Sequence, residues 1–171
     1  VIDNLMYDGV PAEGNFSTES IDETIDTALY DRIEIVRGAT GLMTGAGSPA
    51  ASINLYRKHA DGKELATSLG FTVGSWNDYR VDADVSAPLT SDGRVRARFV
   101  GVYQDTESFQ DLYNKEKVVF SGIVDADLAE NTKLSVGVDF QDNKPNSNTW
   151  GSFPLFLGDG SPANWPRSVT T

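Results

Sequence analysis

A glycine-rich stretch is the first part of the sequence whose residue types and spacing could serve chemistry. Within residues 38–55, the run Gly45-Ala-Gly47-Ser-Pro-Ala50 has the Gly-x-Gly-x-x-Ala spacing of a dinucleotide-binding loop. Such a loop needs a strand before it and a helix directly after it, so that the helix N-terminus faces the pyrophosphate. Residues 51–57 instead alternate apolar and polar side chains as a strand does, and no Gly-Lys-Ser/Thr closes the run as in a phosphate-binding loop. The glycines therefore predict tight turns between two strands rather than a nucleotide site.

The other reactive residue types form no catalytic or metal-binding pattern. The sequence has no Cys and a single His, His59, which excludes thiolate chemistry and multi-His metal sites. Asp and Glu are plentiful, yet no pair stands out by its spacing as acid and base, and no Ser/His/Asp arrangement surrounds His59. A net charge of −11 without a cluster of Lys or Arg argues against nucleic acid as a partner. We therefore expect neither an enzyme nor a resident cofactor or metal.

The first 58 residues mix short strands, turns and one expected helix. Residues 5–10 predict a strand that ends in a turn, and residues 32–37 and 51–57 predict two further strands. Ser20-Ile-Asp-Glu23 has the Ser-x-x-Glu spacing of a capping box, which predicts a short helix over residues 21–30.

After residue 62 the pattern changes to long alternating segments. Each carries apolar side chains on one face and mostly polar side chains on the other, at residues 64–74, 79–87, 94–104, 118–128 and 133–142. Five such segments in succession predict an antiparallel meander. The connection at residues 105–116 and the stretch after residue 142 are long and carry aromatic residues, so one end of the sheet is expected to bear long loops.

The polar faces of the second and third segments carry opposite charges. If Ser86 aligns with Arg94, Asp84 lies opposite Arg96 and Asp82 lies opposite Arg98, giving two cross-strand ion pairs. Strands of 9 to 11 residues with one apolar and one polar face are typical of a transmembrane β-barrel, whose lumen would hold these pairs. A soluble β-sandwich or lipocalin-like module that binds a small ligand shows the same alternation and is the alternative.

Several stretches are similar to one family. Tyr30-Asp-Arg-Ile-Glu-Ile-Val-Arg-Gly38, Gly41-Leu-Met-Thr-Gly45 and Ser48-Pro-Ala-Ala-Ser-Ile-Asn-Leu-Tyr-Arg-Lys58 resemble the end of the plug domain of TonB-dependent outer-membrane receptors. Tyr7-Asp-Gly-Val-Pro11 resembles the strand and turn before an apical plug loop. Thr149-Trp-Gly-Ser-Phe-Pro-Leu-Phe156 resembles the long external loop after the fifth barrel strand. Within the family, the chain looks like the ferric-siderophore receptors of the ferripyoverdine, coprogen and ferrichrome type.

The resemblance implies a mainly β fold in two parts. Residues 1–58 would be the C-terminal part of an α+β plug domain, residues 59–63 a linker, and residues 64–171 the first five antiparallel strands of a transmembrane β-barrel with a long external loop. Plugged barrels of this kind have about 22 strands, so the chain is expected to be an internal segment with an incomplete barrel. The implied function is TonB-dependent uptake of a ferric siderophore across the outer membrane. The implied partners are the siderophore, the TonB complex and outer-membrane lipid.

The same resemblance implies roles for individual residues. The siderophore already fills the coordination shell of the iron, so the protein would offer aromatic and amide contacts rather than metal ligands. The expected contacts are Asn15 and Phe16 on the apical loop and Trp150, Phe153 and Phe156 on the external loop. Trp76 is expected to be an interfacial anchor in the aromatic girdle. Arg37 and Arg32 are expected to pair with barrel glutamates beyond residue 171 and to lock the plug in place.

Overall fold

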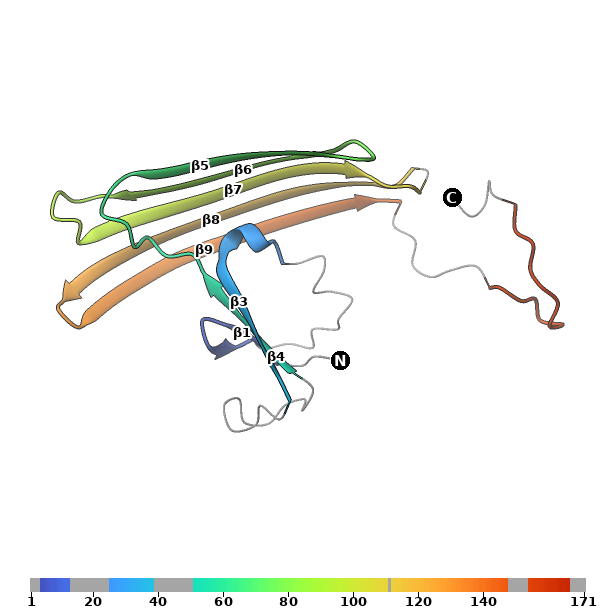
Figure 1. Cartoon of the computed structure of the whole chain (residues 1–171), viewed down its shortest axis with the longest axis horizontal. Coiled ribbons are helices and arrows are strands. Elements are labelled where there is room, and N and C mark those ends of the chain that lie inside the picture. Colours follow the sequence, from blue (N-terminus) through green and yellow to red (C-terminus); the bar gives the residue numbers. More distant parts are fainter. Residues whose placement is uncertain (1–3, 13–24, 39–50, 111, 148–153, 167–171) are drawn as a thin grey trace.

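The chain forms two separate β-sheets. The structure, a computed structural model, describes residues 4–12, 25–38, 51–110, 112–147 and 154–166. The small sheet has four strands and the large sheet has five. In Figure 1 the small sheet lies beneath one face of the large, curved sheet. We call that face of the large sheet the inner face and the opposite one the outer face.

The small sheet is built from four short strands: β1 (Asn4–Tyr7), β2 (Val10–Pro11), β3 (Tyr30–Arg37) and β4 (Ala51–Arg57). β1 runs parallel to β4, whereas the β1–β2 and β3–β4 pairs are antiparallel. The predicted strands at 32–37 and 51–57 are confirmed. The strand predicted at 5–10 is broken at Asp8 and Gly9, whose φ angles of 51° and 81° turn the chain back on itself. The side-chain carbonyl of Asn54 accepts a hydrogen bond from the N–H of Gly9 and fixes this turn.

The helix predicted over residues 21–30 is wrong in the part that the structure describes. Only Thr27–Leu29 form one 3-10 turn, and Tyr30 already belongs to β3. The N-cap of this turn is Asp26, whose side chain accepts from the N–H of Ala28, so a local cap closes a single turn instead of starting a longer helix. The Ser20 to Glu23 capping box lies outside the described residues.

The large sheet confirms the predicted antiparallel meander. Its strands are β5 (Ala66–Gly74), β6 (Asp78–Pro88), β7 (Val95–Glu107), β8 (Asn114–Ala129) and β9 (Thr132–Asn146). β7, β8 and β9 are longer than the alternation predicted, so the connection expected at 105–116 shrinks to residues 108–113. The sheet is open, with β5 and β9 at its edges. The β5–β6 turn, the β7–β8 connection and residues 154–166 lie toward the right-hand end in Figure 1.

The register between β6 and β7 differs from the prediction by four residues. Ser86 faces Arg98 rather than Arg94. A tight turn causes the shift: the hydroxyl of Thr90 accepts from the N–H of Val95 and donates to the carboxylate of Asp92. The predicted opposition of Asp84 to Arg96 and of Asp82 to Arg98 is therefore wrong. Because the shift is even, every side chain keeps its predicted face.

The two faces of the large sheet differ sharply. The outer face is a continuous apolar surface, and its exposed members are Leu69, Phe71, Val73, Tyr79, Val81, Phe99, Tyr103, Phe120, Val124, Leu128, Leu134, Val136, Val138 and Phe140. The inner face carries the charged residues, together with a small apolar cluster in which Leu29 packs with Val100, Val102 and Val119. Leu29 thus gives the 3-10 turn an apolar contact with the large sheet. In the described parts of the chain, no helix is long and apolar enough to cross a membrane.

Candidate functional site

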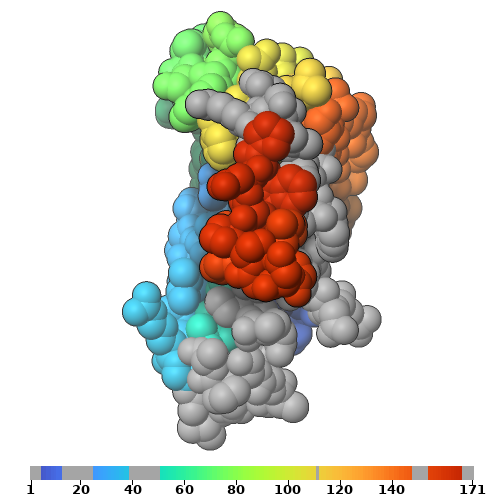
Figure 2. All heavy atoms as spheres, turned by 90° about the vertical axis from the view of Figure 1, so that its right-hand side faces the viewer, coloured from blue at the N-terminus to red at the C-terminus, as the bar shows by residue number. Residues whose placement is uncertain are grey.

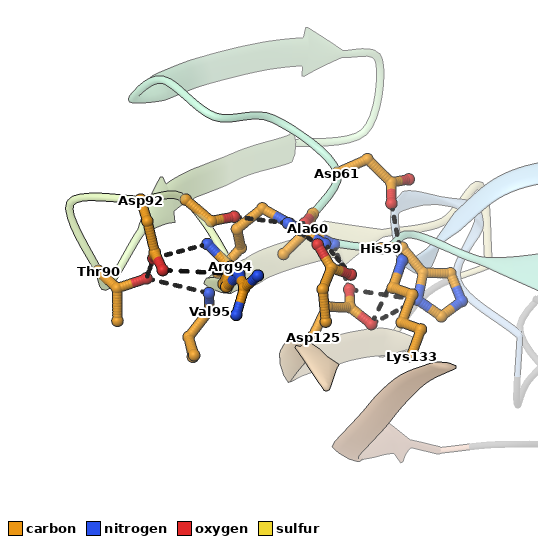
Figure 3. Close-up of polar contacts among 12 residues, drawn as sticks. His59, Ala60, Asp61, Thr90, Asp92, Arg94, Val95, Asp125 and Lys133 are labelled. Carbon is orange, nitrogen blue, oxygen red and sulfur yellow. Dashed lines mark hydrogen bonds and ion pairs between the residues drawn. The ribbon is translucent and has the colours of Figure 1, made fainter. Parts of the chain in front are cut away.

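The chain passes from the small sheet to the large sheet along the inner face. We call residues 58–61 the junction. The N–H of Ala60 donates to Asp125 Oδ2 at 2.7 Å, and its carbonyl accepts from Arg96 Nε at 2.7 Å. Ala60 is fully buried, so both of its backbone groups are satisfied by side chains of the large sheet. Figure 3 shows Ala60 close to Asp125.

Asp125 is the centre of the junction network and has no exposed surface. Besides the N–H of Ala60, it accepts a hydrogen bond from the hydroxyl of Ser135. His59 Nδ1 lies 3.1 Å from Asp125 Oδ1, and Lys133 Nζ lies 3.6 Å from the same oxygen. An ionised carboxylate only accepts hydrogen bonds, so it suits a position surrounded by donors.

A second part of the network holds the junction from the side of β6 and β7. Arg98 makes a two-pronged ion pair with Asp84, with both N···O distances at 2.8 Å. Lys58 Nζ donates to the same carboxylate at 2.8 Å, and Arg98 Nη1 donates to the carbonyl of His59 at 3.0 Å. Both sides of the junction are therefore tied to charged groups of the large sheet.

The four residues expected to form lumen ion pairs all lie on the inner face, but with other partners than predicted. Asp84 pairs with Arg98, and Arg96 pairs with Asp127 of β8 at 2.7 Å. Asp82 approaches Arg80 at 3.8 Å. The charge pattern thus identified the correct face, while the actual pairs depend on the register and on strand β8.

A separate contact joins the 3-10 turn to β6 and β8. Arg80 donates from Nη1 to Asp26 Oδ2 at 2.8 Å and from Nη2 to Asp26 Oδ1 at 2.9 Å. Lys117 Nζ donates to Asp26 Oδ2 at 3.2 Å, and only 2% of the Asp26 side chain is exposed. Burial alone would raise the pKa of Asp26. The hydrogen bonds from Arg80 and Ala28 and the charges of Arg80 and Lys117 outweigh burial, and they hold this pKa well below its ordinary value.

The predicted siderophore contacts are only partly covered by the structure. Asn15, Phe16, Trp150 and Phe153 lie outside the described residues. Phe156 is 61% exposed and forms an isolated β-bridge with Pro162. Residues 154–166 form a compact unit, because the indole N–H of Trp165 donates to the carbonyl of Pro154 at 3.0 Å. Figure 2 looks onto this end of the molecule, with the unit in front.

The expected plug-locking arginines are both exposed on β3. Arg32 donates to Glu34 at 2.8 Å, and its guanidinium lies over the ring of Tyr56, 3.7 Å from the ring centroid. Arg37 is the last residue of β3. Their pairing with glutamates beyond residue 171 stays a prediction. Trp76, in the turn between β5 and β6, packs edge-on against Phe109 with 6.3 Å between ring centroids.

Sequence reasoning missed the two buried carboxylates that matter most for how the two sheets meet. Asp26 was assigned to a helix, and Asp125 was counted only as part of the polar face of its strand. A signal existed for Asp125, since it stands in an Asp-Ala-Asp alternation facing the same side as Arg96. Its main partners come from the junction, 65 residues away, and no spacing rule gives that distance. In the described residues, no group of three or more His, Asp or Glu side chains is arranged to hold a metal ion.

Comparison with known proteins identifies the family. Residues 3–52 match the TonB-dependent receptor plug domain. The chain is 46% identical to the ferripyoverdine receptor of Pseudomonas aeruginosa over 98% of its own length and 21% of that protein. It is 43% identical to the ferric-pyoverdine 358 receptor of Pseudomonas putida over 99% of its length and 20% of that protein. The chain thus spans about a fifth of the curated relatives it matches.

Solved structures agree in fold. The pyoverdine outer membrane receptor FpvA from Pseudomonas aeruginosa bound to pyoverdine superposes with a TM-score of 0.83 at 44% identity, covering 97% of this chain and 24% of that one. The alcaligin outer-membrane receptor of Bordetella pertussis gives a TM-score of 0.72 at 42% identity, covering 84% of this chain and 24% of that one. The chain therefore belongs to the family of TonB-dependent outer-membrane receptors.

Proposed function

We propose that this chain is part of a receptor that takes up a ferric siderophore of the pyoverdine class across the outer membrane, driven by TonB. The observation that carries the proposal is the identity of 46% and 43% to two ferric-pyoverdine receptors over nearly the whole chain. The relatives are transport receptors rather than enzymes. The soluble β-sandwich alternative is disfavoured by the same relatives.

The physical character of the large sheet supports a place in the membrane wall. A continuous aliphatic and aromatic outer face of this size is a liability in water, but it is the surface that lipid chains require. The inner face, in contrast, carries paired charges and contacts the small sheet. We assign the small sheet to the plug and the large sheet to the barrel wall.

In this proposal the protein recognises the chelate and leaves the iron in its own ligand shell. Asn15, Phe16, Trp150, Phe153 and Phe156 would contact the siderophore, and no resident cofactor would be needed. Arg37 and Arg32 would lock the plug to barrel glutamates. TonB would supply the energy for moving the plug, through a region of the receptor outside this chain.

The test uses the complete receptor in cells that lack other ferripyoverdine receptors. Uptake of radioactive iron presented as ferripyoverdine is expected, and a protonophore should abolish uptake while leaving surface binding intact. Trp150→Ala should weaken binding at least tenfold, whereas Trp76→Ala should not change it, because Trp76 is assigned to the lipid interface. Absence of both binding and uptake for a panel of ferric pyoverdines would refute the proposed substrate class.

A further inference from the structure

In the contact made by Asp26, the charges are exchanged relative to the lock expected from Arg32 and Arg37, in which the plug supplies the bases. Here the plug supplies the acid and the wall supplies the bases, Arg80 from β6 and Lys117 from β8. The carboxylate therefore bridges two strands of the wall that are not adjacent in the sheet, since β7 lies between them.

We propose that Asp26, Arg80 and Lys117 form a release catch, which holds the Thr27–Leu29 turn against the wall at rest and opens when the plug moves during transport. This inference rests on the proposed transport function. The junction around Asp125 is by contrast the fixed attachment, at which the plug stays tied to the wall. Asp26 is thus a positioning residue, with no contact to the siderophore required.

The wall is arranged so that the catch can open without leaving its arginine unpaired. Arg80 Nη1 already lies 3.4 Å from Gln104 Oε1, and Arg80 Nε lies 3.8 Å from Asp82 Oδ1. When Asp26 moves away, these two groups and entering water can accept the hydrogen bonds of the Arg80 guanidinium. An ion pair also suits a catch because water rehydrates both charges when the pair opens, which offsets part of the lost Coulomb attraction.

The apolar contact between the 3-10 turn and the wall is small, so it can separate together with the ion pair. Among the described residues of the small sheet and the 3-10 turn, only Leu29 enters the cluster of Val100, Val102 and Val119, with Ala28 and Tyr30 packed at its margin. At the junction the situation differs, because the N–H and the carbonyl of the buried Ala60 are both held by wall side chains. Opening there would leave backbone groups of a buried residue without partners.

The first experiment measures hydrogen exchange of residues 25–31 and 56–65 in the complete receptor without siderophore. Asp26→Asn is the informative variant because Asn caps a helical turn as well as Asp does, while the charge is lost and an NH2 group replaces the oxygen that accepts from Arg80 and Lys117. Exchange of residues 25–31 should become at least tenfold faster, while that of residues 56–65 should stay unchanged. Asp31→Asn is the matched control, since it removes the same charge from an exposed position five residues away. Equal exchange in wild type and Asp26→Asn would overturn the catch.

The second experiment asks whether the catch must open. Leu29→Cys and Val102→Cys are combined in a receptor without other cysteines and joined by a short thiol cross-linker, with each single variant as control. Surface binding of ferripyoverdine should persist, and uptake should fall at least tenfold until the link is cleaved. Undiminished uptake by the cross-linked receptor would overturn the release role. A wild type that exchanges as expected but binds no ferric pyoverdine would refute the proposed function and leave the resting contact established.

Discussion

Replacing Asp125 tests how firmly the junction is held to the wall. In Asp125→Asn the single carbonyl oxygen can still accept from the N–H of Ala60, while the amide group turns toward His59 and Ser135. The hydroxyl of Ser135 can rotate to accept, and His59 can present an unprotonated nitrogen. What is lost is the charge, which makes each hydrogen bond stronger by roughly 1 kcal/mol and attracts Lys133. We expect the local opening free energy at Ala60 to fall by about 1–2 kcal/mol, or roughly 5- to 30-fold faster exchange.

Asp125→Ala removes all of these bonds at once. It leaves the N–H of Ala60 buried without an acceptor and Lys133 without this carboxylate, so the expected loss is about 3–5 kcal/mol. Exchange of the Ala60 amide should accelerate more than about 100-fold. Hydrogen exchange of residues 56–65 in the complete receptor measures both variants. Asp61→Asn serves as the control, because its ion pair with Lys133 is largely exposed and worth less than about 1 kcal/mol. Unchanged protection of Ala60 in Asp125→Ala would show that the buried carboxylate does not hold the junction.

Three further predictions concern the plug contact and the register. Leu29→Ala should weaken docking of the 3-10 turn by about 2–5 kcal/mol, seen as faster exchange of residues 25–31; an unchanged rate would mean that the apolar cluster contributes nothing. The lowered pKa of Asp26 means that its contribution to stability is present above the ordinary carboxylate pKa of 3.8 and is lost as the pH falls toward the lower folded value. Acidification below about pH 5 should therefore loosen the same residues progressively, and Asp26→Asn should remove this dependence; an equally steep dependence in that variant would assign it to other groups. On oxidation, Val85→Cys with Phe99→Cys should form a disulfide, because these residues face each other. Val85→Cys with Val95→Cys should not, and the reverse outcome would contradict the register.

The faces of the strands were predictable because lipid-facing and plug-facing side chains must alternate. The register was not, since aligning Ser86 with Arg94 or with Arg98 gives the same alternation. The difference lies in the turn, where Thr90 and Asp92 bond locally and Gly93 adopts a φ of 67°. Turn chemistry of this kind decides which residues face each other but leaves no trace in the apolar pattern.

The buried carboxylates were beyond sequence reasoning for a different reason. Asp26 meets Arg80 from 54 residues away, and Asp125 meets Ala60 from 65 residues away. Both contacts join parts of the chain that lie far apart in the sequence. Neither the capping pattern near Asp26 nor the polar alternation around Asp125 predicts these distant partners. The resemblance to the receptor family predicted that the two parts meet, and the structure shows the side chains through which they do.

The parallel pairing of β1 with β4 bears on the order in which the molecule folds. Asn4 faces Ser52, so the small sheet must close a loop of nearly fifty residues before this pair can form. The hairpins of the large sheet join near neighbours, as where Gly74 faces Asp78. Local hairpins form faster than distant pairs, so wall hairpins can assemble while the central pair of the plug is still open. On this order of events the plug would close against a wall that has already formed, and changes in β4 should delay plug closure without slowing formation of the wall.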